Sequence, residues 1–121
     1  MAGVESKSLN SPDERRTPDK TRVEVVNLGA TTVGRFRLEP GWRWSECIKP
    51  VVGGDSCHAR HIGYVVSGSL QVEHEDGTSE ELSPGDAYVI EPGHDAWVNS
   101  DEPWVALEFE SKSAAEYAKG S

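Results

Sequence analysis

The sequence lacks any long apolar run. Its apolar stretches are only a few residues long, whereas a helix that crosses a membrane needs about 20 consecutive apolar residues. The first ten residues, M-A-G-V-E-S-K-S-L-N, also lack the apolar segment of an export signal. We therefore expect a cytoplasmic protein without a membrane partner.

Cysteine is scarce, with only Cys47 and Cys57 in the chain. The two do not form a C-x-x-C pair, and in a reducing compartment both are expected to be free thiols. Their spacing alone leaves a disulfide between them open.

Basic residues are missing from the second half of the chain. Twelve acids and no Lys or Arg lie from Glu73 to Glu110, and the formal net charge of the chain is −9. Proteins that bind nucleic acid present a basic surface to the phosphates. We therefore expect neither nucleic acid nor an anionic membrane as a partner, and we interpret the acidity as a contribution to solubility.

Apolar residues are also few in residues 1–20, which carry mainly Ser, Pro, Asp, Glu, Arg and Lys. Such a segment cannot bury enough surface to offset the entropy lost on ordering. Ser11-Pro12 and Thr17-Pro18 add to this, because the residue before a proline avoids the helical region. We predict a disordered tail over 1–20.

The remainder of the chain is rich in short β-branched runs separated by turn residues. The length of 121 residues fits one domain, and the strand pattern predicts an all-β barrel or sandwich. The expected strands cover 22–28, 31–38, 42–46, 56–66, 70–74, 78–82, 87–90, 97–98 and 104–109. Asp76-Gly77 predicts a tight hairpin. Only 114–119 has a helical period, so the tail 111–121 is expected to hold one helical turn at most.

Two stretches carry a family resemblance: His61-Ile-Gly-Tyr-Val-Val-Ser-Gly68 and Ser83-Pro-Gly-Asp-Ala-Tyr-Val-Ile-Glu-Pro-Gly93. In this order and spacing they resemble the two motifs of a small single-domain cupin of the RmlC-like type. The resemblance covers residues 22–110 and implies a double-stranded β-helix, the jelly-roll barrel, with the domain at 21–110. The stretches 40–46 and 92–97 are similar to a bacterial subgroup of cupins without an agreed activity.

The sequence departs from the metal site that this resemblance implies. The usual site has two histidines spaced H-x-H, then a glutamate, then a third histidine. His61 stands at the position of the glutamate, Cys57 and Asp55 lie near the first two histidines, and Ala96 replaces the third. The standard set is therefore absent.

A different metal set remains open. Cys57 and His61 are four residues apart on one expected strand, and together with His94 they suit zinc or iron. The alternatives are a buried free cysteine beside a hydrogen-bonded histidine and a cysteine nucleophile. His58 and His74 are expected to be structural or solvated.

Further residues are candidates for ligand binding. Tyr64 and Trp97 each adjoin one of the motifs, and with Trp44 and His94 they are expected near a ligand; the alternative for the aromatics is a core or a dimer face. Arg35, Arg37 and Arg43 alternate with apolar residues. They either clamp an anion in the cavity or form the solvated side of a strand, paired with the acidic second half of the chain.

Three functions follow. The leading interpretation is a non-catalytic cupin that binds or senses a small polar molecule, with or without a metal, and forms a homodimer. The second is a metal-dependent oxygenase or isomerase that acts on a small polar substrate at Cys57, His61 and His94. The third is a protein-interaction scaffold. The sequence does not decide whether the protein is an enzyme.

Overall fold

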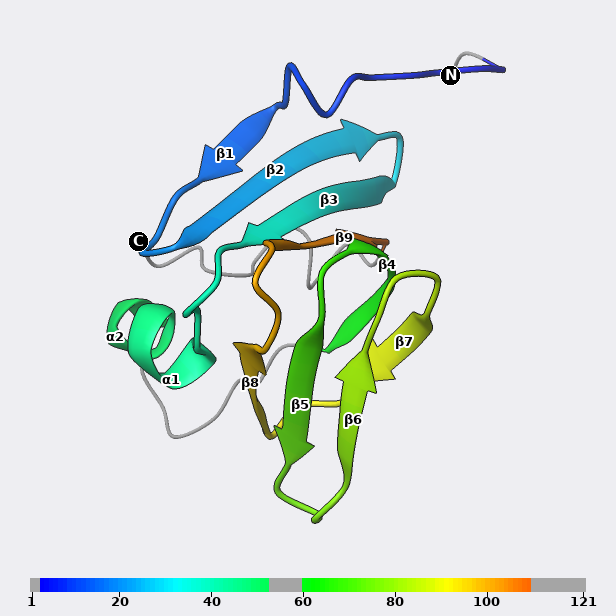
Figure 1. The fold of residues 1–121 in the computed structure, drawn as a ribbon. Coiled ribbons are helices and arrows are strands. Elements are labelled where there is room, and N and C mark those ends of the chain that lie inside the picture. Colours follow the sequence, from blue (N-terminus) through cyan, green and yellow to red (C-terminus); the bar gives the residue numbers. More distant parts are fainter. Residues whose placement is uncertain (1–2, 53–59, 110–121) are drawn as a thin grey trace.

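A computed structural model describes residues 3–52 and 60–109. Two antiparallel β-sheets face each other, with two short helices at one side (Figure 1). In chain order the elements are β1 (Glu14–Arg16), β2 (Thr21–Leu28), β3 (Thr31–Leu38), α1 (Trp44–Cys47), α2 (Lys49–Val52), β4 (His61–Ser67), β5 (Leu70–His74), β6 (Ser79–Leu82), β7 (Ala87–Ile90), β8 (His94–Val98) and β9 (Trp104–Glu108). No helix in the described ranges is long and apolar enough to cross a membrane.

The larger sheet has the strand order β1-β2-β3-β9-β4-β7, and the smaller has the order β6-β5-β8. Strands β4 and β9, which are far apart in sequence, are hydrogen-bonded neighbours. The core lies between the sheets, where alternate residues of each strand are buried; Phe36, Val65, Trp104 and Ala106 are at most 2% exposed. Each large apolar side chain buried there contributes about 1.5–3 kcal/mol.

Most of the predicted strands are confirmed, with boundaries shifted by a few residues. Along β3, Phe36 and Leu38 are buried while Arg35 and Arg37 face outward, as the alternation predicts. The predicted hairpin joins β5 to β6, and Gly77 has the positive φ of 93° that favours glycine.

The strand predicted over 42–46 is wrong, because α1 covers Trp44–Cys47. The alternation of Trp42, Arg43 and Trp44 suggested a strand, but the buried residues that follow are Trp44, Cys47 and Ile48. This i, i+3, i+4 spacing is that of a helix with one buried face. A single β-bridge between Arg43 and Trp97 is what remains of strand pairing there.

The predicted tail also contains ordered structure, since β1 lies within it and pairs with β2. Hydrogen bonds of Asp13 attach this segment to β2. Its backbone N–H donates to the Val25 carbonyl at 2.8 Å, and its carboxylate accepts from the Asn27 N–H at 2.8 Å and from Lys7 Nζ at 2.9 Å. The low apolar content misled the prediction because these bonds use polar groups. The predicted C-terminal turn lies outside the described residues.

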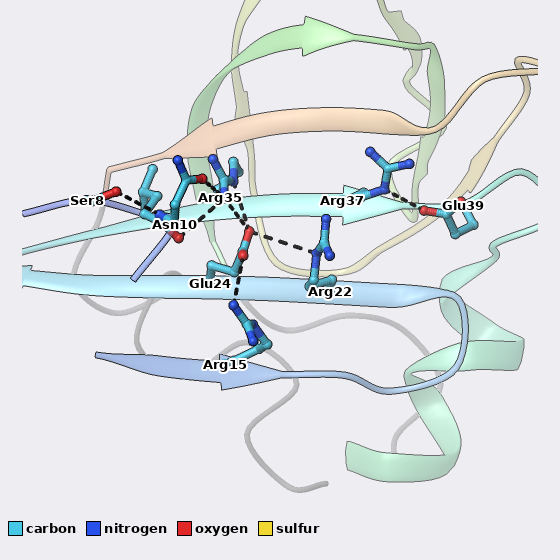
Figure 2. A network of polar contacts seen from close by, with 9 residues as sticks. Ser8, Asn10, Arg15, Arg22, Glu24, Arg35, Arg37 and Glu39 are labelled. Carbon is cyan, nitrogen blue, oxygen red and sulfur yellow. Dashed lines mark hydrogen bonds and ion pairs between the residues drawn. The ribbon is translucent and has the colours of Figure 1, made fainter. Parts of the chain in front are cut away.

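Arg35, Arg37 and Arg43 face outward and are paired with acids, so they do not clamp an anion in the cavity. The expected pairing with the second half of the chain holds for Arg43, which pairs with Asp95, but is wrong for Arg35 and Arg37, whose acids precede it. Figure 2 shows Glu24 among Arg15, Arg22 and Arg35. Glu24 is only 3% exposed, and the Arg35 Nε donates to its Oε1 at 2.9 Å. This network links β1, β2 and β3, and Arg37 pairs with Glu39 in the same way.

Gly63 on β4 marks a close approach between three strands. A Cβ at this position would lie 2.4 Å from the Leu107 carbonyl oxygen on β9 and 2.7 Å from the Tyr88 hydroxyl on β7. Backbone cannot give way cheaply, so any side chain here separates strands that are paired in the fold.

We therefore expect Gly63→Ala to lower the free energy of unfolding by about 2 kcal/mol, the typical cost of overpacking. Urea denaturation followed by circular dichroism measures this. Gly3→Ala is the control, because a Cβ at Gly3 meets nothing within 4 Å. Equal stabilities of the two variants would contradict the close approach.

Candidate functional site

Two histidines meet inside the barrel. His61 begins β4 in the larger sheet and His94 begins β8 in the smaller one. Their ring centroids are 5.2 Å apart with an interplanar angle of 70°, and their exposed fractions are 4% and 3%. The fold thus brings together two of the residues that the sequence singled out.

A buried carboxylate holds His61 in place. His61 Nδ1 lies 2.7 Å from Glu108 Oε1, so the ring N–H donates to the carboxylate. The Tyr88 hydroxyl donates to Glu108 Oε2 at 2.6 Å. Glu108 is 2% exposed, and a buried carboxylate is tolerated when charge-assisted hydrogen bonds occupy its oxygens. The chain Tyr88–Glu108–His61 therefore joins β7, β9 and β4.

Glu108 is not among the site residues predicted from the sequence. A signal was present, because Trp104, Ala106 and Glu108 share one face of β9 by alternation, and two of the three are apolar. An acidic residue that strand alternation places on the buried face indicates that the core holds a polar partner for it.

The proton on His94 is fixed by its surroundings. His94 Nδ1 lies 2.8 Å from the Glu91 carbonyl oxygen. Because a carbonyl only accepts, Nδ1 carries the hydrogen, and the neutral ring has its lone pair on Nε2. Gly93, with φ of 98°, provides the turn that places His94 at the start of β8.

A small cavity of about 30 Å³ lies beside the two histidines. Its lining is mostly aromatic and aliphatic, with a few polar side chains: Phe36, Leu38, Trp42, Trp44, His61, Leu70, Ile90, His94, Ala96, Trp104 and Glu108. A volume of this size has room for a water molecule or one small polar group.

Two indoles at this cavity have unpaired donors. Within residues 3–52 and 60–109, the Nε1 atoms of Trp44 and Trp104 are buried without a hydrogen-bond partner. Trp42 differs, because its Nε1 donates to Thr21 Oγ1 at 2.9 Å. Buried indole N–H groups normally find an acceptor, so the two unpaired donors need an explanation.

The structure separates the other ligand candidates from this cavity. Trp44 lines it, and its contact with a ligand stays a prediction. Tyr64 lies on the outer face of the larger sheet and is 45% exposed. Trp97 pairs with Gln71 on the outer face of the smaller sheet, where the Arg43 guanidinium lies 4.4 Å from its ring centroid. Because successive side chains of a strand point to opposite faces of the sheet, Tyr64 and Trp97 lie on the face opposite to their buried neighbours.

The described residues do not by themselves fit a metal ion. No group of three His, Cys, Asp or Glu side chains in 3–52 and 60–109 is placed to hold one. His61 and His94 supply two imidazoles, but both oxygens of Glu108 are occupied by His61 and Tyr88. Cys57 and Asp55, the other predicted candidates, lie outside the described residues. A zinc or iron site therefore stays a prediction.

The other cysteine and histidine positions have structural roles or are not described. Cys47 is a buried free thiol, and burial raises the pKa of this thiol. His74 donates from Nε2 to the Pro92 carbonyl at 2.8 Å and accepts the Asp76 N–H on Nδ1 at 3.0 Å, which supports a structural role. His58 lies outside the described residues.

A second, larger hollow opens between β6 and β7. Its volume is about 760 Å³. The apolar side chains Val72, Leu82 and Ile90 line it together with acids from the hairpin and the β7 ends. Among the described residues that the sequence proposed for the site, none lines this hollow.

We expect Glu108→Gln to lower the free energy of unfolding by about 2 kcal/mol, because two charge-assisted hydrogen bonds become neutral ones. Chemical denaturation at neutral pH measures the change. The exposed Glu73 on β5 provides the control Glu73→Gln, which is expected to change stability by less than about 0.5 kcal/mol. A Glu108→Gln variant as stable as the control would contradict the buried network.

Comparison with known proteins supports the fold. No protein-family model matches the sequence, and no curated protein matches it. Among solved structures, ectoine synthase from P. lautus is similar with a TM-score of 0.68 and 13% identity, covering 93% of this chain and 83% of that chain.

Two further structures agree. KdgF from Halomonas sp. has a TM-score of 0.54 and 23% identity, covering 79% of this chain and 83% of that one. A cupin domain from Bordetella pertussis has a TM-score of 0.52 and 20% identity, and the similarity covers 78% of this chain and 96% of that one. Together with the sheet order and the two motifs, these similarities confirm the fold predicted from the sequence: the chain has the double-stranded β-helix fold of the cupins.

Proposed function

We propose that this chain binds a small polar molecule inside the barrel, at the cavity beside His61 and His94. The observation that carries the proposal is the pair of buried, unpaired indole N–H donors of Trp44 and Trp104 at that cavity. Leaving one buried donor unsatisfied costs about 1–3 kcal/mol. An acceptor that enters the cavity recovers that cost on binding.

The donors define the chemistry of the ligand. An indole N–H only donates, so the ligand offers an oxygen acceptor, such as a carboxylate or carbonyl oxygen. With the hydrogen on Nδ1, the His94 ring offers its Nε2 lone pair, which can accept a hydrogen bond from a hydroxyl or amide of the same ligand. The oxygens of Glu108 already accept from His61 and Tyr88, so this carboxylate is not the acceptor that the two indole donors lack.

The size of the cavity limits what enters it. Pockets that hold a drug-sized ligand measure about 300–1,000 Å³, whereas this cavity measures about 30 Å³. The ligand is therefore a very small molecule, or it inserts a single polar group among the indoles.

The unpaired indole donors of Trp44 and Trp104 favour ligand binding over the other two functions predicted from the sequence. The name of the ectoine synthase describes an enzyme. A similarity at 13% identity, however, supports a shared fold and not a shared activity. A metal-dependent oxygenase or isomerase and an interaction scaffold stay predictions from the sequence.

Small probes test the proposal directly. We expect formate and formamide to raise the melting temperature of the protein, because each offers an oxygen acceptor, whereas methylammonium, which only donates, does not. At a hundredfold excess over its dissociation constant, a ligand stabilises the protein by about 2.7 kcal/mol. Trp44→Phe removes one N–H donor and is expected to weaken binding about tenfold.

Trp97→Phe is the matched control, because that indole lies outside the barrel under Arg43. It is expected to bind both probes as the unmodified chain does, by calorimetry as well as by melting temperature. The proposal fails if no oxygen-bearing probe stabilises the protein, or if the two tryptophan variants weaken binding equally.

A further inference from the structure

The hollow between β6 and β7 lies where both sheets end. Strand β6 is an edge strand of the smaller sheet, and β7 is an edge strand of the larger one. The hollow measures about 760 Å³, which is within the range of pockets that hold a small organic ligand, about 300–1,000 Å³. It therefore offers the room that the cavity of about 30 Å³ beside the two histidines lacks.

One side chain belongs to both spaces. Ile90 on β7 lines the hollow and also lines the small cavity, and it faces the barrel interior with 9% of its surface exposed. Tyr88, two residues earlier, lines the hollow, and its hydroxyl donates at 2.6 Å to Glu108, which lines the cavity. Where Ile90 lines both, a single side chain separates the hollow from the cavity.

The inner walls of the hollow are apolar. Val72 on β5 and Leu82 on β6 line it from the smaller sheet, and they are 6% and 8% exposed. Ile90 lines it from the larger sheet. Apolar side chains that converge on a space of this size favour an apolar chain of a ligand, since its burial removes hydrocarbon from water.

The polar part of the lining is acidic. Within 3–52 and 60–109, no Lys or Arg lines the hollow, whereas five acids do: Asp76, Glu80, Glu81, Asp86 and Glu91. Arg60 pairs with Glu91 at 3.0 Å, so Glu91 adds little charge. Asp76, Glu81 and Asp86 accept from neutral amide and hydroxyl groups, which leave their negative charge in place. The hollow therefore attracts a cation.

Glu80 is the acid that faces into the hollow. It lies directly opposite Val72 in the register of β5 and β6, and residues paired in this way share one face of the sheet. Glu80 is therefore on the inward face, yet it is exposed because the hollow lies in front of it. In the part of the chain that the structure describes, it has no hydrogen bond or ion pair. Its carboxylate is free to meet a cation from outside the chain.

We propose that the hollow is the outer part of the ligand site and that the ligand is an amine with an oxygen acceptor at the far end of an apolar chain. The ammonium group lies beside Glu80, the chain lies along Val72, and the acceptor passes Ile90 to reach the indoles of Trp44 and Trp104. This inference rests on the proposed function, because the indole donors define the far end of the ligand. It adds the class of molecule, which the small cavity alone leaves open.

A series of three amides tests the inference by calorimetry at low ionic strength: formamide, hexanamide and 6-aminohexanamide. We expect each to bind more tightly than the one before, because the chain adds apolar contact and the ammonium group adds attraction to Glu80. The last step is expected to gain about fivefold, the size of one exposed ion pair.

The variant Glu80→Gln is expected to remove that last gain and to leave hexanamide binding unchanged. Glu73→Gln is the matched control, because Glu73 is an exposed acid of the same hairpin that does not line the hollow. It is expected to bind all three amides as the unmodified chain does. Circular dichroism establishes that both variants fold.

The outcomes separate this inference from the proposed function. If formamide binds but 6-aminohexanamide binds no more tightly, or if Glu80→Gln and Glu73→Gln weaken its binding equally, the inference is overturned and the proposed function stands. If Glu80→Gln weakens 6-aminohexanamide but Trp44→Phe leaves all three amides unaffected, the hollow binds amines without the cavity. That result would overturn both.

Discussion

The Glu108 carboxylate, buried between His61 and Tyr88, is the interaction on which the inside of this barrel depends. It sits on the central strand β9 and its oxygens accept from side chains of β4 and β7, so one acid links three strands that are distant in sequence. Removing such a group leaves buried donors without their acceptor. The same bonds orient His61 toward His94 and make the barrel interior polar on one side.

The rest of the site follows from that constraint. Gly63 has no side chain, and this allows Tyr88 to reach Glu108 beside the Leu107 carbonyl. The turn at Gly93 brings His94 to the opposite wall. Trp44 and Trp104 then close the cavity with donors that find no acceptor among the described residues. A cavity with unpaired donors and mostly apolar walls is suited to a small molecule that carries an oxygen acceptor.

The sequence predicted the strands, the hairpin at Asp76-Gly77 and the fold, because alternation and turn chemistry are local signals. It also singled out His61, His94 and Trp44 as candidate site residues, and the structure places all three around one small cavity. It failed where the deciding contact is distant: Asp13 is held by bonds to β2, and Glu108 by bonds to β4 and β7. Tyr64 and Trp97 adjoin the motifs in sequence, yet strand alternation turns both away from the cavity, so proximity along the chain was a poor guide to the site.

The central claim is that the cavity beside His61 and His94 is a binding site for an oxygen-bearing molecule. A high-resolution crystal structure of the protein as purified from cells tests it most directly. The account predicts density for a molecule other than water, with an oxygen about 3 Å from an indole nitrogen of Trp44 or Trp104. An empty cavity, or one that holds only water even after soaking with formate and formamide, would contradict it.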